Sequence, residues 1–127
     1  MKTRAQTIVA MLYDDVKGIK QNEVVKLRNE GRAKQVPGML LRHGLLQVVA
    51  FMRRIRKEKP GKGDDSADEL YLKLLDGAMR EVLGPDASSF SLTSGYLAKQ
   101  DAMTLLFLNE LAFEVAEWID RVVEAKV

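Results

Sequence analysis

The chain has 127 residues, 46% of them hydrophobic and 30% charged, with no cysteine and a formal net charge of +2. This composition is typical of one compact domain over residues 1–127, and the missing cysteines exclude disulfides and thiolate metal sites. The longest run that is both uncharged and mainly apolar, residues 44–52, is too short to cross a bilayer. The apolar stretch 8–13 is too short for a secretory signal. We therefore expect a cytoplasmic protein without membrane contact.

Charge is distributed unevenly along the chain. Residues 1–62 carry 15 Lys and Arg against 5 Asp and Glu, a balance of +10, whereas residues 63–127 carry 5 against 13, a balance of −8. Such segregation predicts a basic surface for a polyanion in the first half and a different role for the acidic half.

Apolar residues recur at helical spacing, without the sustained alternation of a strand. A first helix is predicted over residues 3–30, although Gly18 inside it costs about 1 kcal/mol relative to alanine. Pro37 suits the first turn of a second helix that runs to about residue 57. The expected core positions of the first helix are Ile8, Leu12, Val16, Ile19 and Leu27, and those of the second are Leu41, Leu45, Val48, Met52 and Ile55.

Three further helical segments are predicted after the loop at residues 58–64. A third helix begins with a capping box of Ser66 and Glu69 and ends at Gly84. A short helical turn near Tyr96 precedes a last helix over residues 101–125, whose wide apolar arc is either central to the bundle or part of a subunit interface. The predicted fold class is all-α, a compact helical bundle of four main helices plus one or two short helices.

Few residues suit catalysis. His43 is the only histidine, and no serine stands in a nucleophile-elbow context. The acidic residues at 64–69 are explained by helix capping rather than by metal binding, and Gly61-Lys62-Gly63 lacks the rest of a phosphate-binding loop. We expect no enzymatic activity, no cofactor and no metal.

Basic clusters at the ends of the first two predicted helices are the remaining signal. Cations at a helix C-terminus stabilise the helix dipole, but two clusters within the basic half favour polyanion binding. Few aromatic residues accompany them, so we expect a groove that follows a phosphate backbone rather than base stacking.

The sequence becomes specific at residues 36–51, VPGMLLRHGLLQVVAF. This segment resembles the signature of the small helical subunit family of the type III-B CRISPR (Cmr) RAMP-module effector complex, with matches at Pro37, Gly44, Leu45, Gln47, Ala50 and Phe51. In this interpretation Gly44 permits close helix approach, Phe51 fills the core, and Gln47 bonds across the bundle or reaches RNA. The segment 109–114 departs from the family pattern, which often has Trp-Leu followed by basic residues.

The resemblance implies a non-catalytic subunit in antiviral defense that lines the channel for guide (CRISPR) RNA and target RNA and stabilises the filament. The implied partners are the repeating RAMP backbone subunit, the large polymerase-like subunit and other copies of the chain itself. The predicted RNA-binding residues are Arg28, Arg32, Lys34, Arg42, Arg53, Arg54, Arg56 and Lys57.

Two alternatives stay open. A helix-turn-helix DNA-binding regulator needs two short helices joined by a turn of three or four residues, whereas the second predicted helix is long and continuous. A small helical oligomeric adaptor, whose basic and acidic halves pair between copies, predicts salt-sensitive self-association without RNA.

Overall fold

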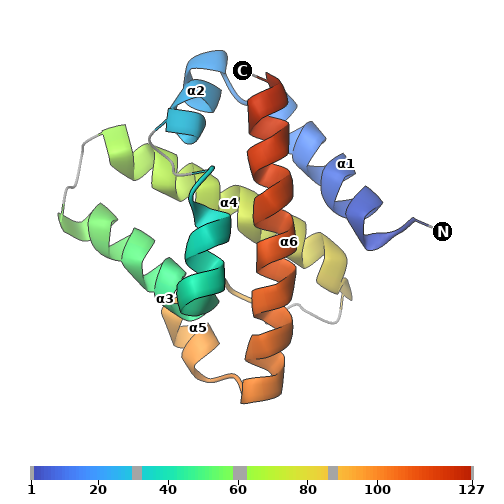
Figure 1. Cartoon of the computed structure of the whole chain (residues 1–127), viewed down its shortest axis with the longest axis vertical. Helices are drawn as coiled ribbons and strands as arrows, with labels where there is room; N and C mark the ends of the chain where they lie inside the picture. Colours follow the sequence, from blue (N-terminus) through green and yellow to red (C-terminus); the bar gives the residue numbers. More distant parts are fainter. Residues whose placement is uncertain (1, 30–32, 59–62, 86–88, 127) are drawn as a thin grey trace.

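A computed structural model describes the backbone of residues 2–29, 33–58, 63–85 and 89–126, with the side chains of these residues except 54–58 and 63–66. Within this part of the chain every regular element is a helix, which confirms the predicted all-α fold (Figure 1). The helices are α1 (Arg4–Lys17), α2 (Gln21–Asn29), α3 (Val36–Glu58), α4 (Gly63–Leu83), α5 (Ser94–Ala98) and α6 (Ala102–Lys126).

The last helix, α6, is the centre of the bundle. It contacts α1, α2, α3 and α4, and Figure 1 shows it running the length of the molecule between α1 and α3, with α4 crossing behind it. Of the two roles predicted for its wide apolar arc, the central position in the bundle is therefore the correct one for most of the helix. The buried residues are Leu108, Leu111, Ala112, Val115, Ala116, Ile119, Val122 and Val123.

The prediction of one continuous helix over residues 3–30 was wrong, because this stretch contains two helices, α1 and α2. Gly18 is the C-cap of α1, and the backbone carbonyl of Lys20 accepts from Glu23 N and Val24 N at 3.0 and 3.1 Å to begin α2. A glycine in a helix interior is costly, and here it marks an end instead. Four of the five predicted apolar positions, Ile8, Leu12, Val16 and Leu27, are buried, and Ile19 is partly buried against the core.

The predicted second helix is also interrupted. Gly44 has φ 81° and ψ 164°, and the two halves of α3 run in different directions (Figure 1). The break lengthens the step between core positions from four to five residues, so that Leu40 and Leu45 are buried while Leu41 is 72% exposed. The prediction that Leu41 lies in the core was therefore wrong, whereas Leu45, Val48 and Met52 are buried as expected. The side chain of Ile55 lies outside the described residues.

Three other helix ends, at the end of α4 and the starts of α5 and α6, follow ordinary capping chemistry. Gly84 has φ 78° and donates its N–H to the Arg80 carbonyl at 2.9 Å, which confirms the predicted end of α4. Thr93 caps α5, the predicted short helix near Tyr96, and Asp101 Oδ1 accepts from Thr104 N at 2.8 Å at the start of α6. The predicted capping box at Ser66 lies outside the described side chains. In the ranges that the structure describes, no helix is long and apolar enough to cross a bilayer.

Candidate nucleic-acid interface

The interruption of α3 is held by a residue from α6. The backbone N–H of Leu45 donates to Asn109 Oδ1 at 2.8 Å, so the remote side chain serves as the cap of the second half of α3. A Cβ added at Gly44 would lie 3.6 Å from Asn109 Nδ2, which is an ordinary contact distance. The predicted reason for this glycine, close helix approach, is therefore wrong: the positive φ is what requires glycine.

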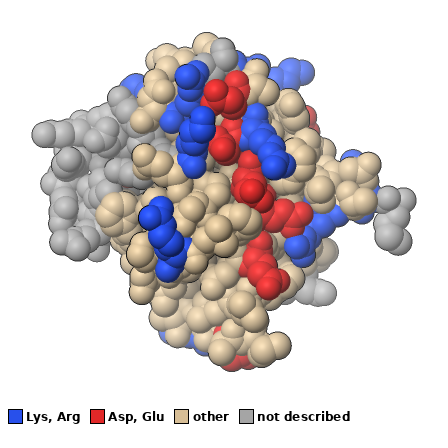
Figure 2. All heavy atoms as spheres, in the orientation of Figure 1, with Lys and Arg blue, Asp and Glu red and all other residues tan. Residues whose placement is uncertain are grey.

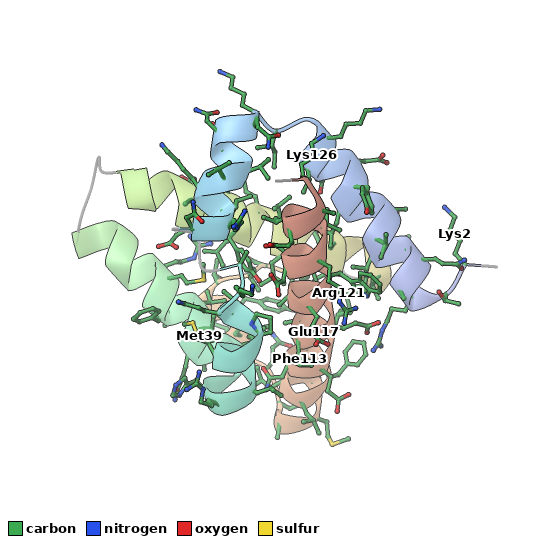
Figure 3. All side chains as sticks on the ribbon, turned by 45° about the horizontal axis from the view of Figure 1, so that its top comes forward. Lys2, Met39, Phe113, Glu117, Arg121 and Lys126 are labelled. Carbon is green, nitrogen blue, oxygen red and sulfur yellow. The ribbon has the colours of Figure 1, made fainter. Side chains whose placement is uncertain are left out.

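A groove lies at this corner, and we call it the elbow groove. It has a volume of about 370 Å³ and is lined by Met39, Arg42, His43, Gln47, Val48 and Phe51. Phe51 is 44% exposed, so the prediction that it fills the core was wrong. The core side of this half-helix is taken by Leu45, Val48 and Met52 instead. In Figure 3 Met39 lies on the first half of α3, close to the corner.

The outer face of α6 carries carboxylates, and we call these the acidic stripe. Figure 2 shows Asp and Glu side chains gathered in a band over this helix, with Lys and Arg on both sides of the band. In Figure 3 Glu117 and Arg121 follow one another along α6. The stripe consists of Glu110, Glu114, Glu117, Asp120 and Glu124, all partly or fully exposed.

Basic residues of the first half pair with this acidic stripe. Arg4 Nη2 lies 2.6 Å from Glu114 Oε2, and Arg28 Nε lies 3.7 Å from Glu124 Oε2. Lys34 shares a shallow hollow with Asp120 and Glu124. The charge segregation along the sequence is therefore partly neutralised within one molecule, because helices from the two halves pack side by side.

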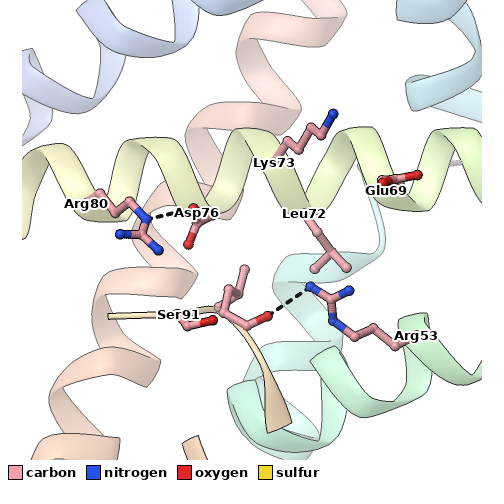
Figure 4. A pocket seen from close by; sticks show the side chains of 8 residues that line it. Arg53, Glu69, Leu72, Lys73, Asp76, Arg80 and Ser91 are labelled. Carbon is pink, nitrogen blue, oxygen red and sulfur yellow. Dashed lines mark hydrogen bonds and ion pairs between the residues drawn. The ribbon is translucent and has the colours of Figure 1, made fainter. Parts of the chain in front are cut away.

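Arg53, also predicted to contact RNA, is half-buried in a different hollow. Its Nη2 donates to the Leu92 carbonyl at 3.2 Å, and Arg80 Nε donates to Asp76 Oδ2 at 2.8 Å (Figure 4). Arg80 Nη2 also donates to the Phe90 carbonyl. The two guanidinium groups thus attach the segment 89–93 to α3 and α4. The hollow is about 210 Å³ and also contains Glu69, so its charges are mixed.

The predicted RNA-binding residues therefore lie on separate parts of the surface. Arg42 is exposed at the elbow groove, where its Nε donates to the Gly38 carbonyl of the same helix at 3.3 Å. Arg28 and Lys34 lie beside the acidic stripe. Arg53, a residue of α3, lines the hollow that α3 shares with α4. Arg32 and the side chains of Arg54, Arg56 and Lys57 lie outside the described residues.

The three-residue connection between α1 and α2 has the length that a helix-turn-helix requires. However, α2 packs against α6 and α4, with Val24 and Leu27 buried. The side chain of Gln21 donates to the Lys126 carbonyl at 3.1 Å. These contacts bury one face of α2 and tie its first residue to the end of α6.

No group of three or more His, Asp or Glu side chains within the described ranges could hold a metal ion. Of the acidic residues near the start of α4, Asp68 is buried, and the side chains of Asp64 and Asp65 lie outside those ranges. The geometry therefore offers grooves and charged surfaces as its candidate functional features.

Comparison with known proteins identifies the chain. The sequence model of the CRISPR-associated protein family Cas_Cmr5 matches residues 4–126 of this all-helical chain. Neither curated proteins nor solved structures gave a significant match. The chain belongs to the Cas_Cmr5 family, the small subunits of the multi-subunit Cmr effector complex, which confirms the resemblance seen at residues 36–51.

Proposed function

We propose that the chain is a non-catalytic small subunit of a type III-B CRISPR effector complex, which lies along the channel for guide and target RNA and stabilises the filament. The family match over residues 4–126 is the observation that carries this proposal. The elbow groove supports it, because the groove lies on the segment 36–51 that resembles the family, includes the matched residues Gln47 and Phe51, and exposes Arg42. The predicted cytoplasmic location stays part of the proposal.

The RNA-facing side in this proposal is the surface of α3 around the elbow. Arg42 is exposed there, and the described side chains that line the groove include no carboxylate. The acidic stripe would repel phosphates, so Arg28 and Lys34 contribute less to RNA binding than their charge suggests. Arg53 contributes less as well, because its Nη2 is already bonded to the Leu92 carbonyl. Arg32, Arg54, Arg56 and Lys57 remain proposed phosphate contacts.

The protein-facing side includes the acidic stripe and an apolar hollow between α3 and α6. This hollow, of about 340 Å³, is lined in part by Leu41, Leu106, Glu110 and Phe113. Leu41 and Leu106 are 72% and 54% exposed, and large exposed apolar side chains that lie together mark protein contacts. The proposed partners are the repeating RAMP backbone subunit, the large polymerase-like subunit and further copies of the chain.

Charge removal at Arg42 tests the RNA-facing surface. In a complex reconstituted with guide RNA, we expect Arg42→Gln to weaken RNA retention in a gel-shift titration and to reduce the log–log salt slope by about one. Lys99→Gln is the matched control, because Lys99 is exposed at the C-cap of α5 and does not line the groove. Equal RNA retention and equal salt slopes for Arg42→Gln and Lys99→Gln would refute the assignment of Arg42 to the RNA-facing surface. A sequence-specific footprint on duplex DNA would instead favour the regulator alternative.

A further inference from the structure

The apolar hollow between α3 and the first half of α6 is surrounded by exposed apolar side chains. Leu41 on α3 is 72% exposed, Leu106 on α6 is 54% exposed, and both line the hollow. Met103 and Phe107 lie within one turn of Leu106 and are 77% and 43% exposed. These are four of the six large hydrophobic side chains that are exposed in the described part of the chain. Apolar surface that is gathered in this way marks a contact with another protein molecule.

A carboxylate beside the hollow restricts what can cover it. Glu110 is exposed and lines the hollow together with Leu106. It forms no ion pair with another described residue, whereas Glu114 of the same stripe pairs with Arg4. A partner that covered Glu110 without bringing a cation would bury an unpaired carboxylate, which is strongly unfavourable. The hollow therefore suits a surface that presents an apolar side chain next to lysine or arginine.

The chain itself presents such a surface, which we call the lysine corner. This second hollow, of about 340 Å³, lies between α1 and α6 and includes Tyr13, Lys17 and Lys126. Tyr13 is 54% exposed, and its side chain forms neither a hydrogen bond nor a ring contact with the other described residues. Both lysines are exposed, and their two positive charges outweigh the one negative charge of Asp14, which also lines the corner.

The two surfaces lie toward opposite ends of α6. Figure 3 shows Lys126 at the end of this helix and Phe113, which lines the apolar hollow, closer to its start. From the rise per residue of an α-helix, the two positions are about 20 Å apart along the helix axis. The surfaces therefore cannot meet within one molecule and can meet only between copies. A contact between two different surfaces of the same chain repeats from copy to copy and builds a filament unless the rotation closes a ring.

We propose that the apolar hollow of one copy receives Tyr13 of the next copy, with Glu110 beside the lysines of the lysine corner. The proposal rests on the proposed function, in which further copies of the chain are partners, and it assigns to that contact two surfaces and a direction. Apolar side chains then cover apolar side chains, and unpaired charges of opposite sign face each other, which fixes the register of the two molecules.

The natural chain has no cysteine, so introduced cysteines report the contact without background. Met103→Cys marks the hollow, and Ala125→Cys marks the lysine corner; both positions are exposed, so the fold should survive. A short bis-maleimide crosslinker should join the two variants into a dimer when they are mixed, and each variant alone should give no more than Glu81→Cys. Glu81 is exposed on α4 and lines neither hollow. A chain that carries both cysteines should give a ladder of higher species.

Charge reversal tests the pairing across the contact. Glu110→Lys in the Met103→Cys partner should lower the dimer yield about tenfold, because like charges then face each other. Lys17→Glu in the Ala125→Cys partner should restore most of that yield, whereas Glu81→Lys, the control, should leave the yield of the original pair unchanged. Added salt should lower the yield of the original pair, since it screens exposed charges.

The same crosslinking in a complex reconstituted with guide RNA completes the test. A dimer that Met103→Cys forms alone as readily as in the mixture would show a contact between identical surfaces and overturn the proposal. Absence of the mixed dimer in both preparations would overturn it as well. A benzophenone attached at Met103→Cys in the complex should photo-crosslink to a second copy, and a crosslink to a different subunit instead would assign the hollow to that subunit. Each of these results leaves the proposed function standing if the complex retains RNA, whereas a chain that binds neither RNA nor the other subunits overturns both proposals.

Discussion

The backbone N–H of Leu45 donates to the side-chain oxygen of Asn109 at 2.8 Å, and this bond joins the middle of α3 to the first half of α6. Leu45 follows directly on Gly44, where the chain turns, so Asn109 satisfies a backbone donor that the interrupted helix leaves open. The family-signature pair Gly44-Leu45 and the segment 109–114, which departs from the family pattern, therefore form one structural unit. The elbow groove depends on this unit for its shape.

Removal of the Asn109 cap should destabilise the fold. We expect Asn109→Ala to lower the free energy of unfolding by about 1–3 kcal/mol, because the half-buried Leu45 N–H loses its acceptor. Asn109→Asp keeps an acceptor oxygen and should cost less. Urea denaturation followed by circular dichroism measures both variants. Equal stability of the alanine variant and the unmodified chain would show that the bond contributes nothing.

A side chain at Gly44 should also be costly, for a different reason. Its φ of 81° and ψ of 164° lie in a region that residues with a Cβ rarely adopt, so we expect Gly44→Ala to cost about 1–3 kcal/mol. Gly95→Ala is the control, because Gly95 lies in α5 without a positive φ and no other atom would lie within 4 Å of its Cβ. Thermal melts should show a lower Tm for the first variant only. A Tm for Gly44→Ala at or above that of the control would contradict the assigned backbone conformation.

The two arginines that attach the segment 89–93 should control its local opening. We expect Arg80→Met to destabilise the chain by about 1–2 kcal/mol, because Arg80 bonds to Asp76 and to the Phe90 carbonyl. Amide hydrogen exchange should rise first at residues 89–93. Lys73→Met is the control, since Lys73 is exposed beside the same hollow. Unchanged exchange in the Arg80 variant would argue against this attachment.

Asp15 should make stability depend on pH. Burial, and then the neighbouring Asp14, raise the pKa of the Asp15 carboxyl in the folded chain, and a Cβ at Gly77 of α4 would lie 3.6 Å from its Oδ2. The ionised form is therefore disfavoured on folding, so we expect Asp15→Asn to raise Tm at neutral pH. The gain should shrink as pH falls through the raised pKa of the folded state, because the native carboxyl then takes up a proton.

The matched control for Asp15→Asn is Glu81→Gln, an exposed residue of α4. Melts at several pH values should give a pH-dependent difference in Tm for Asp15→Asn that exceeds the difference for Glu81→Gln. A gain in Tm for Asp15→Asn that is constant over the acid range would show that charge is not its cause.

Much of the fold could be predicted from the sequence, because apolar spacing follows burial. Ile8, Leu12 and Val16 are buried as their spacing predicts, and α4 ends at Gly84 as its residue type predicts. The two errors in helix continuity both concern glycine. Gly18 and Gly44 were treated as tolerated within helices, whereas the structure uses one as a cap and the other as a turn of the chain.

The candidate site could be predicted only in part, because its geometry depends on contacts between distant segments. No local pattern indicates that Asn109 caps Leu45, or that Arg28 lies beside Glu124. Charge counting identified the basic half but not its partial neutralisation by α6. Once the break at Gly44 is known, Leu45, Val48 and Met52 define the buried face of the second half of α3. Phe51 lies outside that face and is therefore exposed.

The central claim is that this chain acts as a small subunit on the RNA of a Cmr effector complex. The most direct measurement is affinity purification of the native protein from its own cells, with sequencing of the bound RNA and mass spectrometry of the bound proteins. We expect the purified protein to carry short guide RNAs with a repeat-derived tag, together with several RAMP-type subunits. Recovery of the chain free of RNA and of those subunits would contradict it.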